Sequence, residues 1–318
     1  MPAGNVVAIP MTTTFRGLMV REAVLVGGPG GYGEFSPFVE YDDEEALSWW
    51  RATREALEEG WPAPVRDKVA VNATVPATDP QRAWDIVRAS GCRTAKVKVA
   101  EKGQTEAEDL ARIEAVRDAI GPDGIIRIDV NTGWDVDTAV DRIPRYARAA
   151  GELEYVEQPC VTVDELAAVR RRVDVRIAAD ESIRRAADPL LVRDKQAADI
   201  VILKVQPLGG VRACLRLAEE VGLPVVVSSA IETSVGIAAG VALAAALPEL
   251  DHSCGLATVA LLTDDVVTEP LLPIDGYLPV RPFVVDEAKL STLAAPPDRA
   301  ALWRDRLARV RALDAARA

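Results

Sequence analysis

The sequence feature that most constrains the fold is a regular alternation of short apolar runs with helical segments from about residue 68 onward. The runs recur every 23 to 31 residues, at 69–75, 94–99, 125–130, 155–157, 176–179, 200–203, 224–228 and 255–259. The intervening helices are expected from Asp79, over 105–120, around 136–150, and from Val163, about Ala186, Gly210 and Ser234. Strands joined through helices lie parallel, and roughly 200 residues for eight units is the size of a (β/α)8 barrel of the TIM type. A doubly wound open α/β sheet is the alternative, but no dinucleotide-binding turn supports it.

The N-terminal part of the chain has a different pattern, in which β-like segments come before a single helix. Gly28, Gly30 and Gly33 match the spacing GxGxxG, but no helical period follows them, so we expect a hairpin turn and not a dinucleotide site. Asp42 is expected to cap the helix that follows. The tail, 298–318, is predicted to be an amphipathic helix packed on the body of the protein.

Charge and composition limit the classes of partner. The 318 residues include 37 Lys plus Arg against 49 Asp plus Glu, a formal charge of −12. A negative field of this size repels nucleic acid and anionic membrane surfaces. No apolar run reaches the roughly 20 residues of a membrane span, and no signal peptide is expected. Four cysteines without a CxxC pair are typical of a reducing, cytoplasmic environment.

The chain has a single histidine, His252, which excludes histidine-rich metal sites and paired-histidine catalysis. It comes just before the eighth apolar run, at the start of a strand, so we expect it to be structural and to lie away from the chemistry. Another residue type must therefore carry any acid–base chemistry near neutral pH.

Carboxylates end three consecutive apolar runs, at the face where a barrel carries its active site. Asp129, Glu157 and Asp180 follow one another after 28 and 23 residues, each step being one βα unit, so their side chains should converge. Carboxylates that converge in a partly buried mouth repel one another unless a cation is present, and oxygen ligands of this kind suit Mg²⁺. Such an ion would hold a substrate carboxylate and stabilise an ene-diolate. The alternative is that each residue is an ordinary solvated charge at a strand end.

Lysines flank these carboxylates in the predicted order of strands. Lys204 ends the sixth run, 24 residues after Asp180, while Lys96 and Lys98 lie two apart in the second run and therefore face the same side of a strand. A buried lysine is costly without a function. Because nearby positive charge can bring the pKa of a lysine toward neutrality, a lysine here can serve as a general base.

The chain resembles the enolase superfamily, in particular its muconate-lactonizing-enzyme subgroup, in the motifs Lys96-x-Lys98, Asp129-x-Asn131, Glu157-Gln158-Pro159, Asp180-Glu181-Ser182 and Lys204. Segments 31–38, 228–236 and 255–265 are further similar to the o-succinylbenzoate synthases of menaquinone biosynthesis. The resemblance implies an α+β cap over 1–66, a barrel over 67–270 and a C-terminal segment over 271–318 that packs on both.

The reaction that this resemblance implies is loss of water from a small carboxylate, 2-succinyl-6-hydroxy-2,4-cyclohexadiene-1-carboxylate. Lys98 would remove the proton next to the carboxylate and return it to the departing hydroxyl on the same face, and Lys204 would support the ene-diolate from across the ring. The metal would be Mg²⁺, held by the three carboxylates. Further expected roles are an auxiliary charge at Lys96, supporting groups at Asn131 and Glu181, and contacts to the succinyl group from Ser228, Ser229 and the backbone near Gly255. The alternative for Ser228, Ser229 and Gly255 is that small residues are needed there for packing at crowded strand ends. The turn at 27–33 either closes over the substrate or is a plain hairpin.

Other reactions on this scaffold use the same lysines and metal: dipeptide epimerisation, N-acylamino acid racemisation and cycloisomerisation. Dipeptide epimerases carry an Asp-x-Asp pair on the eighth strand, and its absence from 255–258 disfavours that reaction, whereas racemisation stays open. A non-catalytic small-molecule-binding barrel is the alternative from a different class. The intact lysines and carboxylates argue against it.

Overall fold

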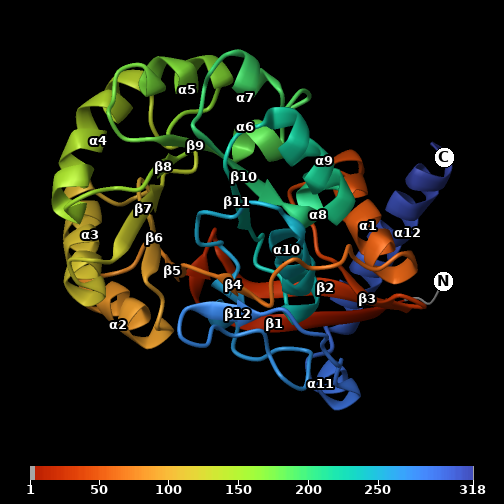
Figure 1. Cartoon of the computed structure of the whole chain (residues 1–318). Helices are drawn as coiled ribbons and strands as arrows, with labels where there is room; N and C mark the ends of the chain where they lie inside the picture. The colour runs from red at the N-terminus through yellow and green to blue at the C-terminus, as the bar shows by residue number, and fades with distance from the viewer. Residues whose placement is uncertain (1–3, 318) are drawn as a thin grey trace.

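The computed structural model, which describes residues 4–317, is built around a curled sheet of seven parallel strands (Figure 1). In sheet order, which is also chain order, the strands are β5 (Ala73–Val75), β6 (Thr94–Lys98), β7 (Ile125–Asp129), β8 (Val156–Glu157), β9 (Ile177–Ala179), β10 (Ile200–Lys204) and β11 (Val225–Ser228). A doubly wound sheet reverses its strand order partway along the chain. The order seen here does not reverse, so the doubly wound alternative is wrong.

Helices connect successive strands, and the longer ones from α2 to α5 form an arc outside the sheet in Figure 1. They are α2 (Pro80–Ser90), α3 (Glu106–Ile120), α4 (Val136–Ala150), α5 (Val163–Arg170), α6 (Glu181–Arg184), α7 (Leu191–Asp194), α8 (Val205–Leu208), α9 (Val211–Val221) and α10 (Ser234–Ala246). Helices α2 to α5 each begin where the side chain of an Asp or Thr accepts a first-turn N–H, at Asp79, Thr105, Asp135 and Thr162. These caps fix the residue at which each of the four helices starts.

The prediction of an eighth strand at 255–259 is wrong. Residues Ala257–Leu261 form a 3₁₀ helix, η1, and only Cys254 and Gly255 lie in the strand position. Each makes one parallel bridge, Cys254 to Val71 near one edge of the sheet and Gly255 to Ser228 at the other. The chain leaves the extended conformation at the next residue, Leu256, where φ is −108° and ψ is 3°. The sheet therefore has seven regular strands, and two residues link its edges.

The prediction of a helix from about Ala186 is also wrong. The chain there forms two one-turn helices, α6 and α7, with the irregular segment 185–190 between them. Pro189 has no N–H to donate and disfavours helical backbone at the residue before it, so a continuous helix cannot cross this point. The result is that Glu181 and Arg184 lie on a short helix directly after β9.

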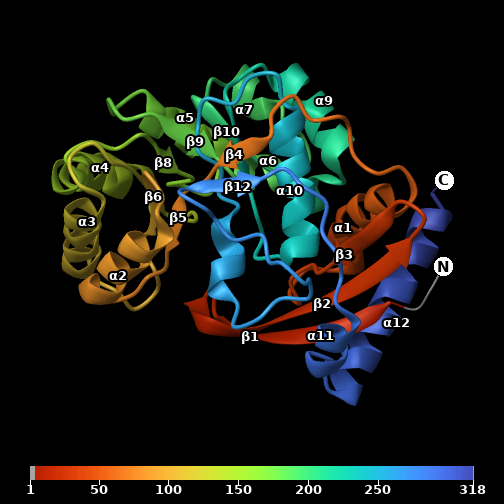
Figure 2. The same cartoon turned by 60° about the horizontal axis from the view of Figure 1, so that its bottom comes forward.

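A second layer is formed by the two ends of the chain, with the C-terminal helices beside the β1–β3 sheet in Figure 2. Its elements are β1 (Asn5–Phe15), β2 (Leu18–Gly28), β3 (Gly31–Phe35), α1 (Asp43–Glu58), α11 (Glu287–Thr292) and α12 (Pro297–Ala315). The predicted hairpin is confirmed, since β2 and β3 pair antiparallel up to Gly28 and Gly31. The capping role of Asp42 is confirmed as well, since its side chain accepts a hydrogen bond from the N–H of Glu45. We call this layer, residues 4–58 with 287–315, the cap.

A short antiparallel pair forms a separate two-stranded sheet: β4 (Lys68–Ala70) pairs with β12 (Tyr277–Pro279). The Ala-rich α10 is apolar on all sides and almost wholly buried, which explains how it packs between the sheet and the cap. None of the helices in 4–317 combines the length and the apolar character needed to cross a bilayer.

Candidate active site

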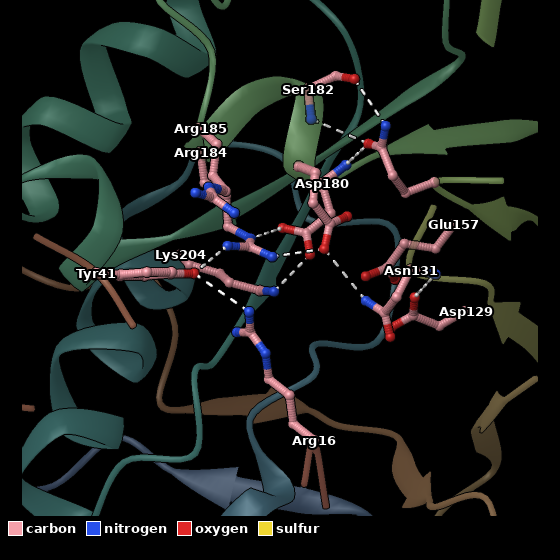
Figure 3. A network of polar contacts seen from close by, with 12 residues as sticks. Arg16, Tyr41, Asp129, Asn131, Glu157, Asp180, Ser182, Arg184, Arg185 and Lys204 are labelled. Carbon is pink, nitrogen blue, oxygen red and sulfur yellow. Dashed lines mark hydrogen bonds and ion pairs between the residues drawn. The ribbon is translucent and has the colours of Figure 1, made fainter. Parts of the chain in front are cut away.

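The three predicted carboxylates meet at the carboxyl ends of neighbouring strands. Asp129 and Glu157 are register partners on β7 and β8, and Asp180 follows β9 directly. The three residues are 1%, 0% and 0% exposed, and all three appear in Figure 3. Burial, together with repulsion from Asp129, raises the pKa of Glu157 to about 7 despite the nearby Lys96. The three groups are therefore close enough to feel one another's charge, as their spacing in the sequence predicted.

Three lysines contact these carboxylates. Nζ of Lys96 lies 3.0 Å from both carboxylate oxygens of Glu157 and 3.1 Å from Oδ2 of Asp129. Nζ of Lys98 donates to Oδ2 of Asp129 at 2.7 Å, and Nζ of Lys204 donates to Oδ2 of Asp180 at 2.7 Å. Lys98 and Lys204 come from β6 and β10, with the three carboxylate-bearing strands between them. The two lysines thus approach the carboxylates from opposite sides.

The charges of the lysines decide the ionisation of their partners. Burial opposes ionisation of Asp129, but Lys98 and Lys96 hold its pKa well below the usual range. Burial also disfavours charge on Lys96, yet the carboxylates of Glu157 and Asp129 outweigh it and raise the pKa of that lysine. Lys96 is therefore a fixed positive charge and not a proton acceptor.

The donor set fits a hard divalent cation. In the part of the chain that the structure describes, no three Asp, Glu, Cys or His side chains stand ready around a metal position, since the carboxylate oxygens pair with the lysines. The chemistry nevertheless suits such an ion: three buried carboxylates, close enough to repel, with no sulfur or imidazole among them. A cation bound here would replace repulsion between these groups with attraction.

An arginine that the sequence analysis did not single out completes the site. Arg184, on α6, donates from Nε to Oδ1 of Asp180 at 3.0 Å and from Nη2 to Oε1 of Glu181 at 2.6 Å. Its Nη1 donates to the hydroxyl of Tyr41 in the cap at 2.8 Å, and Arg16 lies 3.5 Å from the same hydroxyl (Figure 3). The signal for Arg184 was its position four residues after Asp180 on a helix, but no local pattern pairs it with Tyr41.

The two predicted supporting groups lie beside these side chains. Asn131 accepts a hydrogen bond from Nζ of Lys98 and donates from Nδ2 to Oε1 of Glu181 at 3.3 Å. The other carboxylate oxygen of Glu181, Oε2, is buried without a hydrogen-bond partner among residues 4–317. Gln158, which the sequence analysis named in a motif without giving it a role, accepts from the N–H of Asp180 at 2.9 Å and fixes the backbone there.

A pocket opens over this group and is lined both by the curled sheet with its loops and by the cap. Ser228, Ser229 and Gly255 line it, as expected, although the hydroxyl of Ser229 is already bonded to the carbonyl of Gly255 at 2.8 Å. Its other lining residues include Phe15, Arg16, Phe38, Tyr41, Ala230 and Ile231.

The glycine-rich turn between β2 and β3 is a plain hairpin and does not line this pocket. The N–H of Gly30 donates to the carbonyl of Leu57 on α1 at 2.6 Å, which turns the hairpin toward the cap helix. His252 also lies outside the pocket: its Nδ1 is 2.7 Å from Oε1 of Glu154, consistent with the structural role expected for it.

Comparison with known proteins identifies the families and relatives that this chain resembles. A model of the enolase C-terminal domain-like family matches residues 80–282, and one of the enolase N-terminal domain-like family matches residues 6–57. The chain is 66% identical to an o-succinylbenzoate synthase of Thermobifida fusca, over 97% of this chain and 96% of the relative. It is 53% identical to an o-succinylbenzoate synthase of Mycolicibacterium smegmatis, over 97% and 95%.

Among solved structures, the muconate lactonizing enzyme of Pseudomonas putida superimposes with a TM-score of 0.76 at 22% identity, covering 92% of this chain and 98% of that one. The L-Ala-D/L-Glu epimerase of Bacillus subtilis superimposes with a TM-score of 0.72 at 22% identity, covering 88% and 95%. At this identity the likeness concerns the fold alone.

Proposed function

The chain belongs to the o-succinylbenzoate synthases of the enolase superfamily, and we propose that its lysine–carboxylate site removes water from 2-succinyl-6-hydroxy-2,4-cyclohexadiene-1-carboxylate. The protein is accordingly a carbon–oxygen lyase of menaquinone biosynthesis. The observation that carries the assignment of residues is the placement of Lys98 and Lys204 on opposite sides of three buried carboxylates.

The residues that would hold the metal are Asp129, Glu157 and Asp180, and the metal that suits them is Mg²⁺. When bound, the ion supplies positive charge that lowers the energy of negative charge developing on the substrate carboxylate. The lysines that contact these oxygens in the structure would then be free to turn toward the substrate.

Lys98 is the residue that fits proton removal. Both Lys96 and Lys98 line the pocket, but Lys98 contacts one carboxylate, whereas Lys96 contacts two. After taking the proton next to the substrate carboxylate, its ammonium group is placed to protonate the departing hydroxyl on the same face, so one residue serves both steps. Lys204 stays charged on the other side and stabilises the negative charge that develops between the two steps.

The supporting roles follow from the contacts. Asn131 bonds to Lys98 and to Glu181, which orients the lysine, while Lys96 neutralises two carboxylates. Ser228, Ser229 and Gly255 would form the wall that faces the succinyl group.

The test is formation of o-succinylbenzoate from the cyclohexadiene carboxylate by purified protein in Mg²⁺. We expect turnover by the wild type and its loss in Lys98→Arg, because arginine does not give up its proton. Lys195→Arg is the matched control, since Lys195 is exposed and, within residues 4–317, forms an ion pair only with Asp164, and it should keep full activity. Exchange of the substrate's acidic proton with solvent deuterium at a wild-type rate in Lys98→Arg would contradict the assignment of the base.

Racemisation of N-acylamino acids is a second candidate, favoured by the same opposed lysines, which can remove a proton on one face and return it on the other. Assaying N-acyl amino acids and dipeptides beside the cyclohexadiene carboxylate distinguishes the reactions. Loss of this racemisation in Lys204→Ala would support a two-base path.

We further propose domain boundaries at 1–66, 67–270 and 271–318 and a cytoplasmic location. Support for the division comes from two apolar clusters, one made mainly of residues in 67–270 and one made mainly of cap residues, which also takes in Ile231 and Val267 where the two units meet. Support for the location comes from the four cysteines, which are all buried free thiols.

A further inference from the structure

Arg21, in the middle of β2 of the cap, is buried against a loop of the barrel. Its side chain is 2% exposed, and it does not line the pocket. Its Nε donates to the carbonyl of Ile231 at 2.7 Å, and its Nη2 donates to the carbonyl of Ala230 at 3.2 Å. The same Nη2 donates to the hydroxyl of Ser36 at 3.0 Å. One cap side chain therefore holds two consecutive carbonyls of the β11–α10 loop.

The loop that Arg21 holds is strained. Ile231 has φ of +63°, in the left-handed region, which a β-branched residue rarely adopts because its Cβ crowds the backbone. Ile231 and Ala230 nevertheless line the pocket, directly after Ser228 and Ser229. A strained backbone conformation persists only where contacts with the surrounding structure offset the strain. The contacts to this loop must therefore supply the free energy that keeps it in place.

The cap fixes the far side of the same loop through Glu34. Its Oε2 accepts hydrogen bonds from the N–H of Thr233 at 3.1 Å, from the Thr233 hydroxyl at 2.6 Å and from the N–H of Gly236 at 3.1 Å. Its Oε1 accepts from the hydroxyl of Ser36 at 2.7 Å. A Cβ at position 236 would lie 2.9 Å from Glu34 Oε2, so the glycine is what lets this carboxylate reach the start of α10. Arg21, Ser36 and Glu34 form one continuous clamp on the loop.

We propose that Arg21 is a positioning residue that sets substrate binding by holding the strained Ala230–Ile231 segment as one wall of the pocket. It also contacts a further pocket residue, because its guanidinium lies 4.9 Å from the ring centre of Phe38. Ala230, Ile231 and Phe38 are all apolar, so the part of the substrate that they position is its hydrocarbon ring and not its carboxylates. This inference rests on the dehydration proposed above.

The test compares Arg21→Gln with Arg66→Gln. Arg66 donates in the same way to backbone carbonyls, including that of Leu247 at 2.7 Å, but at the other end of α10 and away from the pocket. We expect Arg21→Gln to raise KM about tenfold or more, the factor lost with one charged hydrogen bond, and to change kcat much less. Arg66→Gln should leave KM unchanged. Equal effects of both variants on KM would show a general loss of stability and overturn the proposal.

A second measurement needs no turnover. Hydrogen–deuterium exchange of the backbone over 228–236 should accelerate in Arg21→Gln and stay at the wild-type rate in Arg66→Gln. If the wild type fails to dehydrate the cyclohexadiene carboxylate, the proposed function is wrong, while this exchange result still reports whether Arg21 clamps the loop. Unchanged exchange in Arg21→Gln, or faster exchange with unchanged KM in an active enzyme, would overturn the inference.

The strain itself can be tested by combining Arg21→Gln with Ile231→Gly. Glycine adopts a positive φ without the crowding that isoleucine suffers, so the loop in this background no longer needs to be forced into place. We expect Arg21→Gln to change KM less than about twofold when residue 231 is glycine, a clear departure from additivity. Independent, additive effects of the two substitutions would contradict a role of Arg21 that acts through Ile231.

Discussion

Asp129 and Glu157 end neighbouring strands in register, and one ammonium group, that of Lys96, lies 3.1 Å from Oδ2 of the first and 3.0 Å from both oxygens of the second. All three side chains are buried. Lys98 donates to the same oxygen of Asp129 at 2.7 Å, so in this structure two ammonium groups offset the charge of the two carboxylates. A divalent cation that binds these carboxylates would take over part of that role.

Replacing Lys96 with methionine should destabilise the protein in a metal-dependent way. Removing one partner from a buried ion pair leaves an uncompensated charge and costs about 3 kcal/mol of unfolding free energy. We expect this loss in the presence of a chelator and a smaller loss in Mg²⁺, because the ion then neutralises the same carboxylates. Denaturant unfolding in both conditions measures the difference.

Lys195→Met is the control for that experiment, because Lys195 is exposed and its pair with Asp164 contributes little. It should change stability by less than about 1 kcal/mol in either condition. An equal loss for Lys96→Met with and without Mg²⁺ would argue against a cation at these carboxylates.

Exhaustive chelation should abolish turnover, and Mg²⁺ should restore it. Independently of activity, Mg²⁺ at about 100 times its dissociation constant should stabilise the fold by about 2.7 kcal/mol, because it binds only the folded site. Asp129→Asn should lose this stabilisation, whereas Asp264→Asn, at an exposed carboxylate paired with Lys289, should keep it. Full turnover in a protein shown to hold no metal would refute the metal site.

Stability should fall as the pH rises through the titration of Glu232. Burial, together with repulsion from Glu34, raises the pKa of Glu232 to about 7, and its Oε1 has no hydrogen-bond partner within 4–317. The folded state therefore holds a proton that the unfolded chain releases at about pH 4.5, so the contribution of Glu232 to stability is fully present below that value and is lost by about pH 7.

Glu232→Gln removes this titration and keeps an oxygen to accept the N–H of Ala230, which Glu232 binds at 2.8 Å. Relative to the wild type, the variant should gain at most about 3 kcal/mol at about pH 8 and much less at about pH 5. Urea unfolding at both pH values measures the gain. A gain of the same size at both would show that the charge of Glu232 is not its cause.

The sequence predicted the carboxylates because their placement follows from chain order alone. In a parallel sheet of consecutive strands, residues at the ends of successive apolar runs must become neighbours, so Asp129, Glu157 and Asp180 needed no information beyond their spacing. Lys98 and Lys204 follow by the same argument, one strand earlier and one strand later. The turn at Gly28 and Gly31 could also be predicted from the local sequence, because its residues alone exclude a helix.

The features that could not be predicted from the sequence depend on contacts between distant segments. Arg184 meets Tyr41 across 143 residues, and Arg21 meets Ile231 across 210, and neither pairing leaves a periodic pattern. The prediction of a strand at 255–259 was wrong for a different reason. A short apolar run does not distinguish a strand from a 3₁₀ helix, and packing against the rest of the protein determines which of the two forms.

Removing the hydroxyl of Tyr41 should weaken catalysis by loosening Arg184. That hydroxyl is the only cap group to which Arg184 donates among the described residues, and the arginine in turn holds Oδ1 of Asp180 at 3.0 Å. Tyr41→Phe should therefore lower kcat/KM about fivefold, the factor expected for one net hydrogen bond, and should weaken Mg²⁺ binding in the same direction. Tyr277→Phe is the matched control, since Tyr277 is exposed on β12 and its ring faces Lys68 at 4.5 Å. Steady-state kinetics and a Mg²⁺ titration of both variants measure these effects. Wild-type values for Tyr41→Phe in both assays would show that the cap does not act on the metal site through Arg184.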